Sequence, residues 1–194
     1  MKQKLRHFEP LSLRTLSEAQ IRNLISTYSI SKLLWEKISN HKLSESFIRE
    51  FQRKVVWRTI FIYQTLSESF IREFQSKVDW EMISSHQVLS ENFIREFQYE
   101  LDWYEMSESQ TLSENFIREF QDKVDWEKIS EHQTLSESFI REFQDKVNWN
   151  NISIYQKLSE NFLRKFKKKV KWEFIAEYQT LSEKLIRELK VNLF

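Results

Sequence analysis

The sequence predicts an all-α protein, an α-solenoid of about seven two-helix repeats of 23 residues with atypical terminal caps. Three observations predict this fold: a 23-residue period, two helix-start signals within each period, and the absence of glycine. Helices this short are marginal in water on their own, and neither can shelter its aromatic side chains alone. The repeats therefore have to stack, which buries their aromatic faces, tryptophans included, in a continuous core.

Two sequence markers define the period. The triplet Leu-Ser-Glu begins at Leu43 and returns once in every period as far as Leu181, and tryptophan keeps the same interval from Trp57 to Trp172. A continuous helix turns by about 100° per residue, so its apolar face would move by about 140° with each repeat. Heptads do not fit the period either. Each repeat must therefore contain a break.

Two capping signals place that break. In the repeat that begins at Leu112, Ser113 and Asp125 stand half a period apart, and an acidic residue and then an isoleucine follow each of them. Serine and aspartate are preferred N-caps, and acidic residues favour the first turn of a helix. The pairs spaced as hydrophobic staples around these caps are Leu112 with Ile117 and Val124 with Ile129. We expect two helices per repeat, each of about eight to ten residues.

The helical period assigns an inward face to each helix. The inward residues are Phe116, Ile117 and Phe120 in the first helix, and Trp126, Ile129, Ser130 and Gln133 in the second. We expect the small residue after the isoleucine to let two helices approach closely. A buried amide needs partners, so the recurring glutamines predict a hydrogen-bond ladder between adjacent repeats or to helix-end carbonyls.

The period also divides the chain into segments. Residues 1–42 depart from it and contain the only proline, Pro10, so they are interpreted as an N-terminal cap with a degenerate first repeat. Residues 43–180 hold six regular repeats, and residues 181–194 lack a tryptophan helix and are interpreted as a C-terminal capping helix.

Charged residues interrupt any apolar signal core, and no apolar run could span a bilayer. We therefore expect a soluble, cytoplasmic protein.

Little in the sequence points to catalysis or to a bound cofactor. The chain has no cysteine for thiolate ligands and no glycine for a phosphate-binding loop. His86 and His132 occupy one slot two repeats apart, about 20 Å by helix packing, which is too far to share a metal. The recurring aspartates are explained as N-caps. We expect no enzymatic activity, no metal and no cofactor.

Each repeat also carries an arginine four residues after a glutamate, the favourable order for a helical ion pair. We interpret these arginines as a solvated ion-pair lattice, with a phosphate-binding ladder as the alternative.

Charge is distributed unevenly along the chain. Residues 1–60 have a net charge of +7, residues 61–157 of −10 and residues 158–194 of +4. The sharpest basic cluster consists of Arg164, Lys165, Lys167, Lys168, Lys169 and Lys171. This cluster is a candidate contact for nucleic acid or an acidic protein. A solubilising end cap explains it equally well.

The outward positions of the second helix vary between repeats, whereas those of the first helix hardly change. Several of the variable residues are apolar or aromatic although they are expected to be exposed, which is typical of a protein contact. The candidate partner-binding residues are Met82, Tyr99, Tyr104, Glu105, Glu108, Lys128, Asn151, Ile154 and Phe174. Neutral drift would give the same pattern without any partner.

The amino-acid motif of the repeat is similar to motifs in known repeat proteins. The segment LSESFIREFQ stands at 43–52, 66–75 and 135–144, and motifs such as VDW and YQ or HQ follow it. It resembles short helical repeats of giant DNA viruses and large phages. The resemblance implies a viral or phage origin, a helical array and a location in the host cytoplasm, and it makes the inhibition of a host-defence protein a plausible role. It implies no family-wide activity.

The favoured interpretation is a non-enzymatic scaffold that binds a macromolecule, most readily a protein, through the variable second-helix surface. Nucleic-acid binding through the basic ends is the first alternative. Self-assembly, with basic ends meeting acidic centres, is the second, and the sequence leaves the oligomeric state open.

Overall fold

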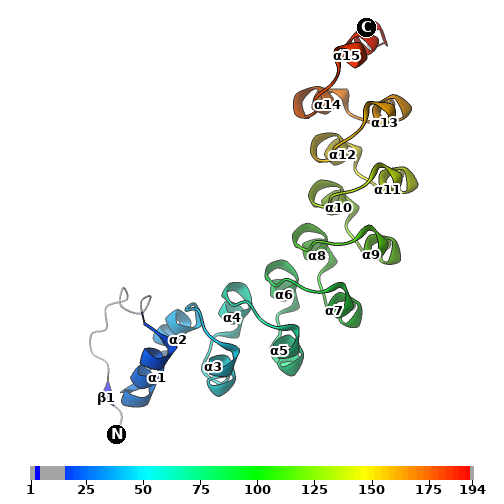
Figure 1. Cartoon of the computed structure of the whole chain (residues 1–194). Helices are drawn as coiled ribbons and strands as arrows, with labels where there is room; N and C mark the ends of the chain where they lie inside the picture. The colour runs from blue at the N-terminus through cyan, green and yellow to red at the C-terminus, as the bar shows by residue number, and fades with distance from the viewer. Residues whose placement is uncertain (1–2, 5–15, 193–194) are drawn as a thin grey trace. The chain divides into compact units, whose positions relative to one another are not determined.

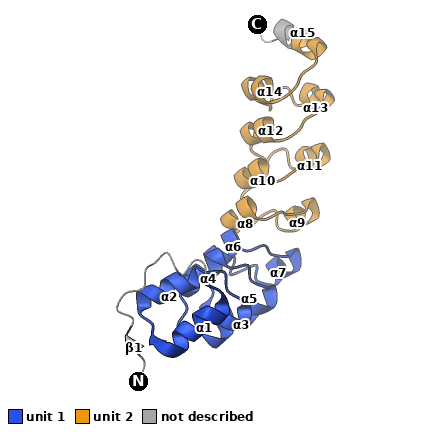
Figure 2. Ribbon diagram, turned by 60° about the vertical axis from the view of Figure 1, so that its left-hand side comes forward, with its two compact units in different colours: residues 1–101 blue, residues 102–194 orange. Residues whose placement is uncertain are grey.

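The computed structural model describes residues 3–4 and 16–192, and it confirms the all-α solenoid (Figure 1). A first and a second short helix alternate with a period of 23 residues, and second helices pack on the second helices of neighbouring repeats. The strands β1 (Gln3–Lys4) and β2 (Tyr28–Ser29) pair in parallel near the N-terminus. Pro10 lies outside the described residues. The chain divides into two compact units, residues 1–101 and residues 102–194 (Figure 2).

Unit 1 contains the irregular first repeat and the repeats that follow it. Its helices are α1 (Glu18–Thr27), α2 (Lys32–Ser39), α3 (Glu45–Glu50), α4 (Trp57–Tyr63), α5 (Glu68–Glu73), the 3-10 helix η2 (Gln75–Lys77), α6 (Trp80–His86) and α7 (Glu91–Glu96). The extra residues of the first repeat lengthen α1 to ten residues and form β2 before α2 begins. The second helices α2, α4 and α6 contact one another in order.

Unit 2 continues the same pattern. Its helices are α8 (Trp103–Ser109), α9 (Glu114–Glu119), α10 (Trp126–His132), α11 (Glu137–Glu142), α12 (Trp149–Tyr155), α13 (Glu160–Lys165), α14 (Trp172–Tyr178) and α15 (Glu183–Asn192). The second helices α8, α10, α12 and α14 form one column and the first helices α9, α11 and α13 another (Figure 1). No described helix has the length and apolar character needed to cross a membrane.

The predicted caps are confirmed, whereas the helices are shorter than expected. The Ser113 hydroxyl accepts the Phe116 amide at 3.2 Å, and the Asp125 carboxylate accepts the Lys128 amide at 2.9 Å. The regular first and second helices of unit 2 have six and seven residues. The first helix stops early because the chain turns at Phe120 (φ −109°, ψ 27°). The second ends at Gln133 in extended backbone. No described residue has positive φ, so these turns need no glycine.

Phenylalanines from the first helices form the centre of the core. Phe116 and Phe139 have no exposed surface, whereas Trp126 is half-buried. The Trp126 ring packs 5.0 Å from the Phe143 ring of the next repeat, and its indole N–H donates to the Gln121 carbonyl at 2.9 Å. The tryptophans were expected in the core, and in the regular repeats they are half-buried. The Lys146 Nζ also lies 5.7 Å from the centre of the Trp126 ring.

The predicted glutamine ladder is confirmed. The Gln133 side chain is 5% exposed, and its Oε1 accepts the Leu112 amide at 3.0 Å. Its Nε2 donates to the carbonyls of Ser107 at 3.1 Å and Gln110 at 2.7 Å. Each glutamine thus satisfies three backbone groups that precede its own helix. The same pattern recurs at Gln64, Gln87, Gln156 and Gln179.

The small residue of the second helix does more than allow close packing. Ser130 is fully buried, as predicted for a residue between two helices. Its hydroxyl donates to the Trp126 carbonyl at 2.6 Å and accepts the Asn148 amide of the next repeat at 2.9 Å. Ser39, Ser107 and Ser153 make the same pair of bonds. The serines therefore bond consecutive second helices as well as separating them.

Candidate functional site

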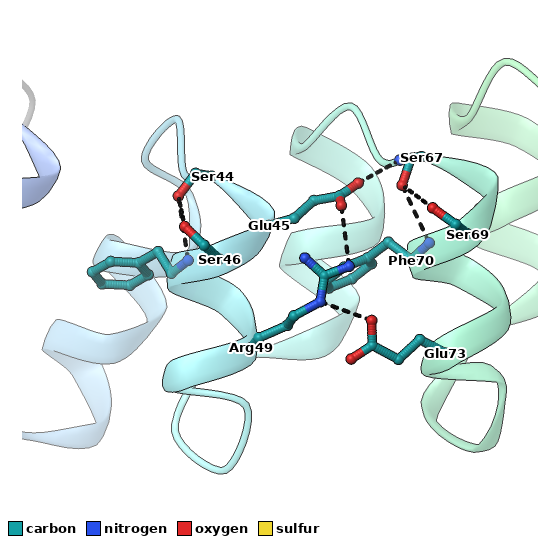
Figure 3. Close-up of polar contacts among 9 residues, drawn as sticks. Ser44, Glu45, Ser46, Arg49, Ser67, Ser69, Phe70 and Glu73 are labelled. Carbon is teal, nitrogen blue, oxygen red and sulfur yellow. Dashed lines mark hydrogen bonds and ion pairs between the residues drawn. The ribbon is translucent and has the colours of Figure 1, made fainter.

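A polar ladder runs along the first helices, and Figure 3 shows one rung of it in unit 1. The Glu45 carboxylate accepts the Ser67 amide of the next repeat at 2.6 Å and also pairs with Arg49. Arg49 Nε donates to Glu73 at 2.7 Å, and the guanidinium lies 4.9 Å from the centre of the Phe70 ring. One repeat thus supplies the glutamate that accepts the N-cap amide of the next repeat. It also supplies the arginine that pairs with a glutamate of that next repeat.

The same rung recurs between an arginine of one first helix and a glutamate of the next first helix, 24 residues further along the chain. The further rungs are Arg72 with Glu96, Arg118 with Glu142 and Arg164 with Glu188. Hydrogen bonds from Ser182 hold the pKa of Glu160 below its ordinary value, and the bond to Glu188 raises the pKa of Arg164. The predicted ion-pair lattice is confirmed, and it joins adjacent repeats as well as residues four apart.

Arg141 breaks this ladder. At the end of the next first helix, where the rung requires a glutamate, the chain has Lys165. Within the part of the chain that the structure describes, Arg141 makes no ion pair, hydrogen bond or ring contact, and its side chain is exposed. The arginines of the complete rungs are half-buried. A lysine in the acceptor position repels the guanidinium, which is why Arg141 lies free.

The unpaired Arg141 helps to line a basic hollow of about 550 Å³ in unit 2. The residues that line it are Arg141, Gln144, Lys165, Phe166, Lys167, Lys168 and Lys169. The structure thus brings together four of the six residues predicted as a basic cluster. The other two lie elsewhere: Arg164 pairs with Glu160 and Glu188, and Lys171 is the N-cap of α14. Gln144 was not predicted, and Arg141 was predicted only as one of the repeat arginines, although the constant spacing of arginine and glutamate from one repeat to the next would have singled it out.

Part of the predicted partner surface comes together between α8 and α10. The Lys128 Nζ lies 2.5 Å from the Glu108 carboxylate and 4.8 Å from the centre of the Tyr104 ring. The hydrogen bond between them raises the pKa of Lys128 and lowers that of Glu108. In the next repeat, Asn151 Nδ2 donates to the Glu127 carbonyl at 3.2 Å. These variable residues therefore contact one another across adjacent second helices.

A second hollow, of about 330 Å³, lies at the ends of α12 and α14. Its lining consists of Ile154, Tyr155, Gln156, Lys157, Leu158, Tyr178, Gln179 and Thr180, and we call it the tyrosine groove. Tyr155 is 53% exposed and Tyr178 55%. A hydrogen bond to Glu177 raises the pKa of the Tyr178 hydroxyl. Ile154 was predicted here. Tyr155 and Tyr178 were not among the predicted partner residues.

Other predicted partner residues are less accessible or lie apart. Met82 was expected to be exposed, but it is buried in α6, a second helix that packs on α4. Glu105 and Phe174 occupy the same position and are half-buried. Tyr99 is 84% exposed, but it lies in the turn after α7, in unit 1.

Lys171 occupies an N-cap position without a side-chain cap bond. Asp125 and Asn148 hold the equivalent positions of α10 and α12, and their side chains cap those helices. Replacing Lys171 by aspartate is therefore expected to raise the free energy of unfolding by about 1 kcal/mol, measured by urea titration. Lys168→Asp makes the same charge change away from the cap and is expected to alter stability by less than about 0.5 kcal/mol. An equal gain in both variants would attribute the effect to charge alone.

Among the described residues, no group of three or more histidine, aspartate or glutamate side chains is arranged to hold a metal ion. The structure thus presents two candidate binding regions in unit 2, the second-helix surface with its tyrosine groove and the basic hollow.

The resemblance to viral and phage repeats stays a prediction. Comparison with protein-family models, with curated proteins and with solved structures finds no match to this chain.

Proposed function

We propose that the protein is a non-enzymatic repeat scaffold that binds a basic segment of a partner protein along the second helices of unit 2. The observation that carries this proposal is the tyrosine groove, where Tyr155 and Tyr178 are both more than half exposed beside Ile154. Tyrosine offers a large apolar ring with a polar end, and it is enriched where proteins bind one another.

The charge around the groove supports a basic partner. The outward positions of α8, α10, α12 and α14 carry six glutamates, namely Glu105, Glu108, Glu127, Glu131, Glu173 and Glu177. Lys128 is the basic residue among these positions, and Glu108 already pairs with it. Lysine or arginine side chains of a partner would meet carboxylates along this surface and aromatic rings in the groove, where cation–π contacts are favourable.

The contact of Lys128 with Tyr104 and Glu108 supports this proposal as an example of the same chemistry within the protein. Lys128 lies over an exposed aromatic ring while a carboxylate accepts its charge. Tyr178 and Glu177 offer the same combination at the groove, with Tyr155 on the other side. A partner side chain that carries a cation would occupy there the place that Lys128 occupies between α8 and α10.

A displayed library of random peptides tests the proposal. Peptides selected by the full chain are expected to be enriched in arginine and lysine next to apolar residues. A selected peptide is then titrated against the Tyr155→Ser, Tyr178→Ser double variant by fluorescence anisotropy. The loss of both rings is expected to weaken binding by at least about tenfold, as for aromatic residues at the centre of an interface.

Tyr63 provides the matched control. It occupies the same slot at the end of α4 in unit 1 and is 61% exposed. Tyr63→Ser therefore makes the same chemical change outside the proposed surface and is expected to leave peptide binding unchanged. Selection of acidic peptides, or equal binding by the double variant and the wild type, would show that this surface is not the binding site.

A further inference from the structure

We propose that the basic hollow between α11 and α13 binds a small molecule with two or more neighbouring phosphate groups. This site is separate from the second-helix surface, because its lining residues come from the ends of α11 and α13 and from the turns that follow these helices. The helices α11 and α13 are neighbours in the column of first helices in unit 2 (Figure 1). Its volume of about 550 Å³ is within the usual range of small-ligand sites, and five of its lining side chains are cationic.

Three of the five cations of the hollow are departures from the repeat, and all three add positive charge. Lys165 stands where the first helices from α3 to α11 end in glutamate, and Lys168 stands where the two preceding repeats have Asp122 and Asp145. Lys167 likewise replaces a glutamine. Each departure removes an acceptor or a neutral group and adds a cation. Their concentration around one hollow is what an anionic ligand would require.

Arg141 supplies the group best suited to phosphate. Its guanidinium carries five donors in a planar fork that matches two phosphate oxygens, and no described residue uses them. In the complete rungs, the equivalent arginines are held by glutamates at 2.7–2.9 Å. Because the rung is broken at Lys165, a phosphate group can take the place that a carboxylate holds in the rest of the ladder.

The other side chains form a partly fixed wall. Lys169 is held by the Asp145 carboxylate at 2.7 Å and the Gln144 carbonyl at 3.1 Å. Phe166 is buried and provides an apolar floor, and the Lys165 Nζ lies 5.9 Å from the centre of its ring. Lys167 and Lys168 are exposed and make no ion pair within the described residues. Arg141, Lys165, Lys167 and Lys168 therefore provide charge that the protein itself does not neutralise.

The surroundings favour a compact ligand over a nucleic acid. A strand that followed the stack of first helices would meet Arg118 already paired with Glu142 on one side and Arg164 paired with Glu188 on the other. Among the ladder arginines of unit 2, Arg141 is the one that has no carboxylate partner within the described residues. A polymer gains affinity from a continuous series of phosphate contacts, which these neutral rungs do not offer.

Isothermal titration with inorganic triphosphate, inorganic phosphate and a single-stranded oligonucleotide tests the proposal at low salt. Saturable binding of triphosphate to the full chain is expected, tighter than that of phosphate and of the oligonucleotide. Lys165→Glu restores the consensus rung with Arg141 and is expected to weaken triphosphate binding by more than about tenfold. Arg141→Gln removes the bidentate donor and is expected to weaken it by about tenfold.

The Lys165→Glu variant is informative because it should fold at least as well as the wild type. Its thermal unfolding midpoint is expected to be equal or higher, since the other rungs have this glutamate. Lys184→Glu in α15 makes the same charge change outside the hollow and serves as the matched control, with triphosphate affinity kept within about twofold. The proposal is overturned if triphosphate does not bind the wild type, if Lys165→Glu and Lys184→Glu have equal effects, or if the oligonucleotide alone binds.

Discussion

Replacing Phe139 by alanine is expected to lower the free energy of unfolding by about 3–5 kcal/mol. The ring is fully buried and contacts Phe143 within its own repeat and Trp126 of the preceding repeat, at 4.7 Å and 6.2 Å between ring centres. The guanidinium of Arg118 covers it on the outer side. Truncation leaves a cavity at the contact between two repeats, and the cavity adds to the cost of the lost apolar burial.

Urea titration followed by far-UV circular dichroism measures this loss. Trp126→Ala is the comparison variant, because Trp126 touches the same phenylalanines but is half-buried, and its removal is expected to cost less than that of Phe139. Since stability in a stacked array is shared between neighbours, hydrogen exchange should increase first in the repeats next to Phe139. A loss below about 1 kcal/mol for Phe139→Ala would contradict this account of the core.

The second large effect is expected at Gln133. Replacing it by alanine leaves the Leu112 amide and the carbonyls of Ser107 and Gln110 without their partner. A buried polar group without a hydrogen bond costs about 1–3 kcal/mol, and water entering the vacated space recovers part of the total. We therefore expect a decrease in the free energy of unfolding of about 2–4 kcal/mol, measured by urea titration.

Gln121→Ala is the matched control for this prediction. Gln121 is half-buried in the turn after α9, and its side chain accepts one hydrogen bond from Lys146 at 3.0 Å. Its removal is expected to change stability by less than about 1 kcal/mol. Equal losses in the two variants would mean that the glutamine ladder contributes no more than an ordinary surface contact.

The features that the sequence predicted depend on local chemistry. A serine or aspartate before an acidic residue caps a helix wherever it stands, so Ser113 and Asp125 located both helix starts. Helical angles then assigned Phe116 and Ile129 to the core, where they have no exposed surface. Gln133 was predicted correctly because a buried amide must find partners.

The features that the sequence did not predict depend on contacts between repeats. The length of a first helix, such as α9, is set by the position of the turn that ends it at Phe120. Capping rules for the helix start do not give that position. Met82 is buried because of how closely two second helices pack. Arg141 was not singled out because its missing partner belongs to the next repeat, beyond the reach of pairing rules for a single helix.

The bonds between repeats also have a direction along the chain. A glutamate in one repeat accepts the cap amide of the repeat after it, whereas a glutamine bonds to carbonyls of the repeat before it. The capping glutamate and the ladder glutamine therefore make the same contacts at successive junctions, although the ion pair between repeats is missing at Arg141. One whole repeat can be inserted or removed without altering the fit at either junction, whereas the insertion or removal of part of a repeat would misalign both.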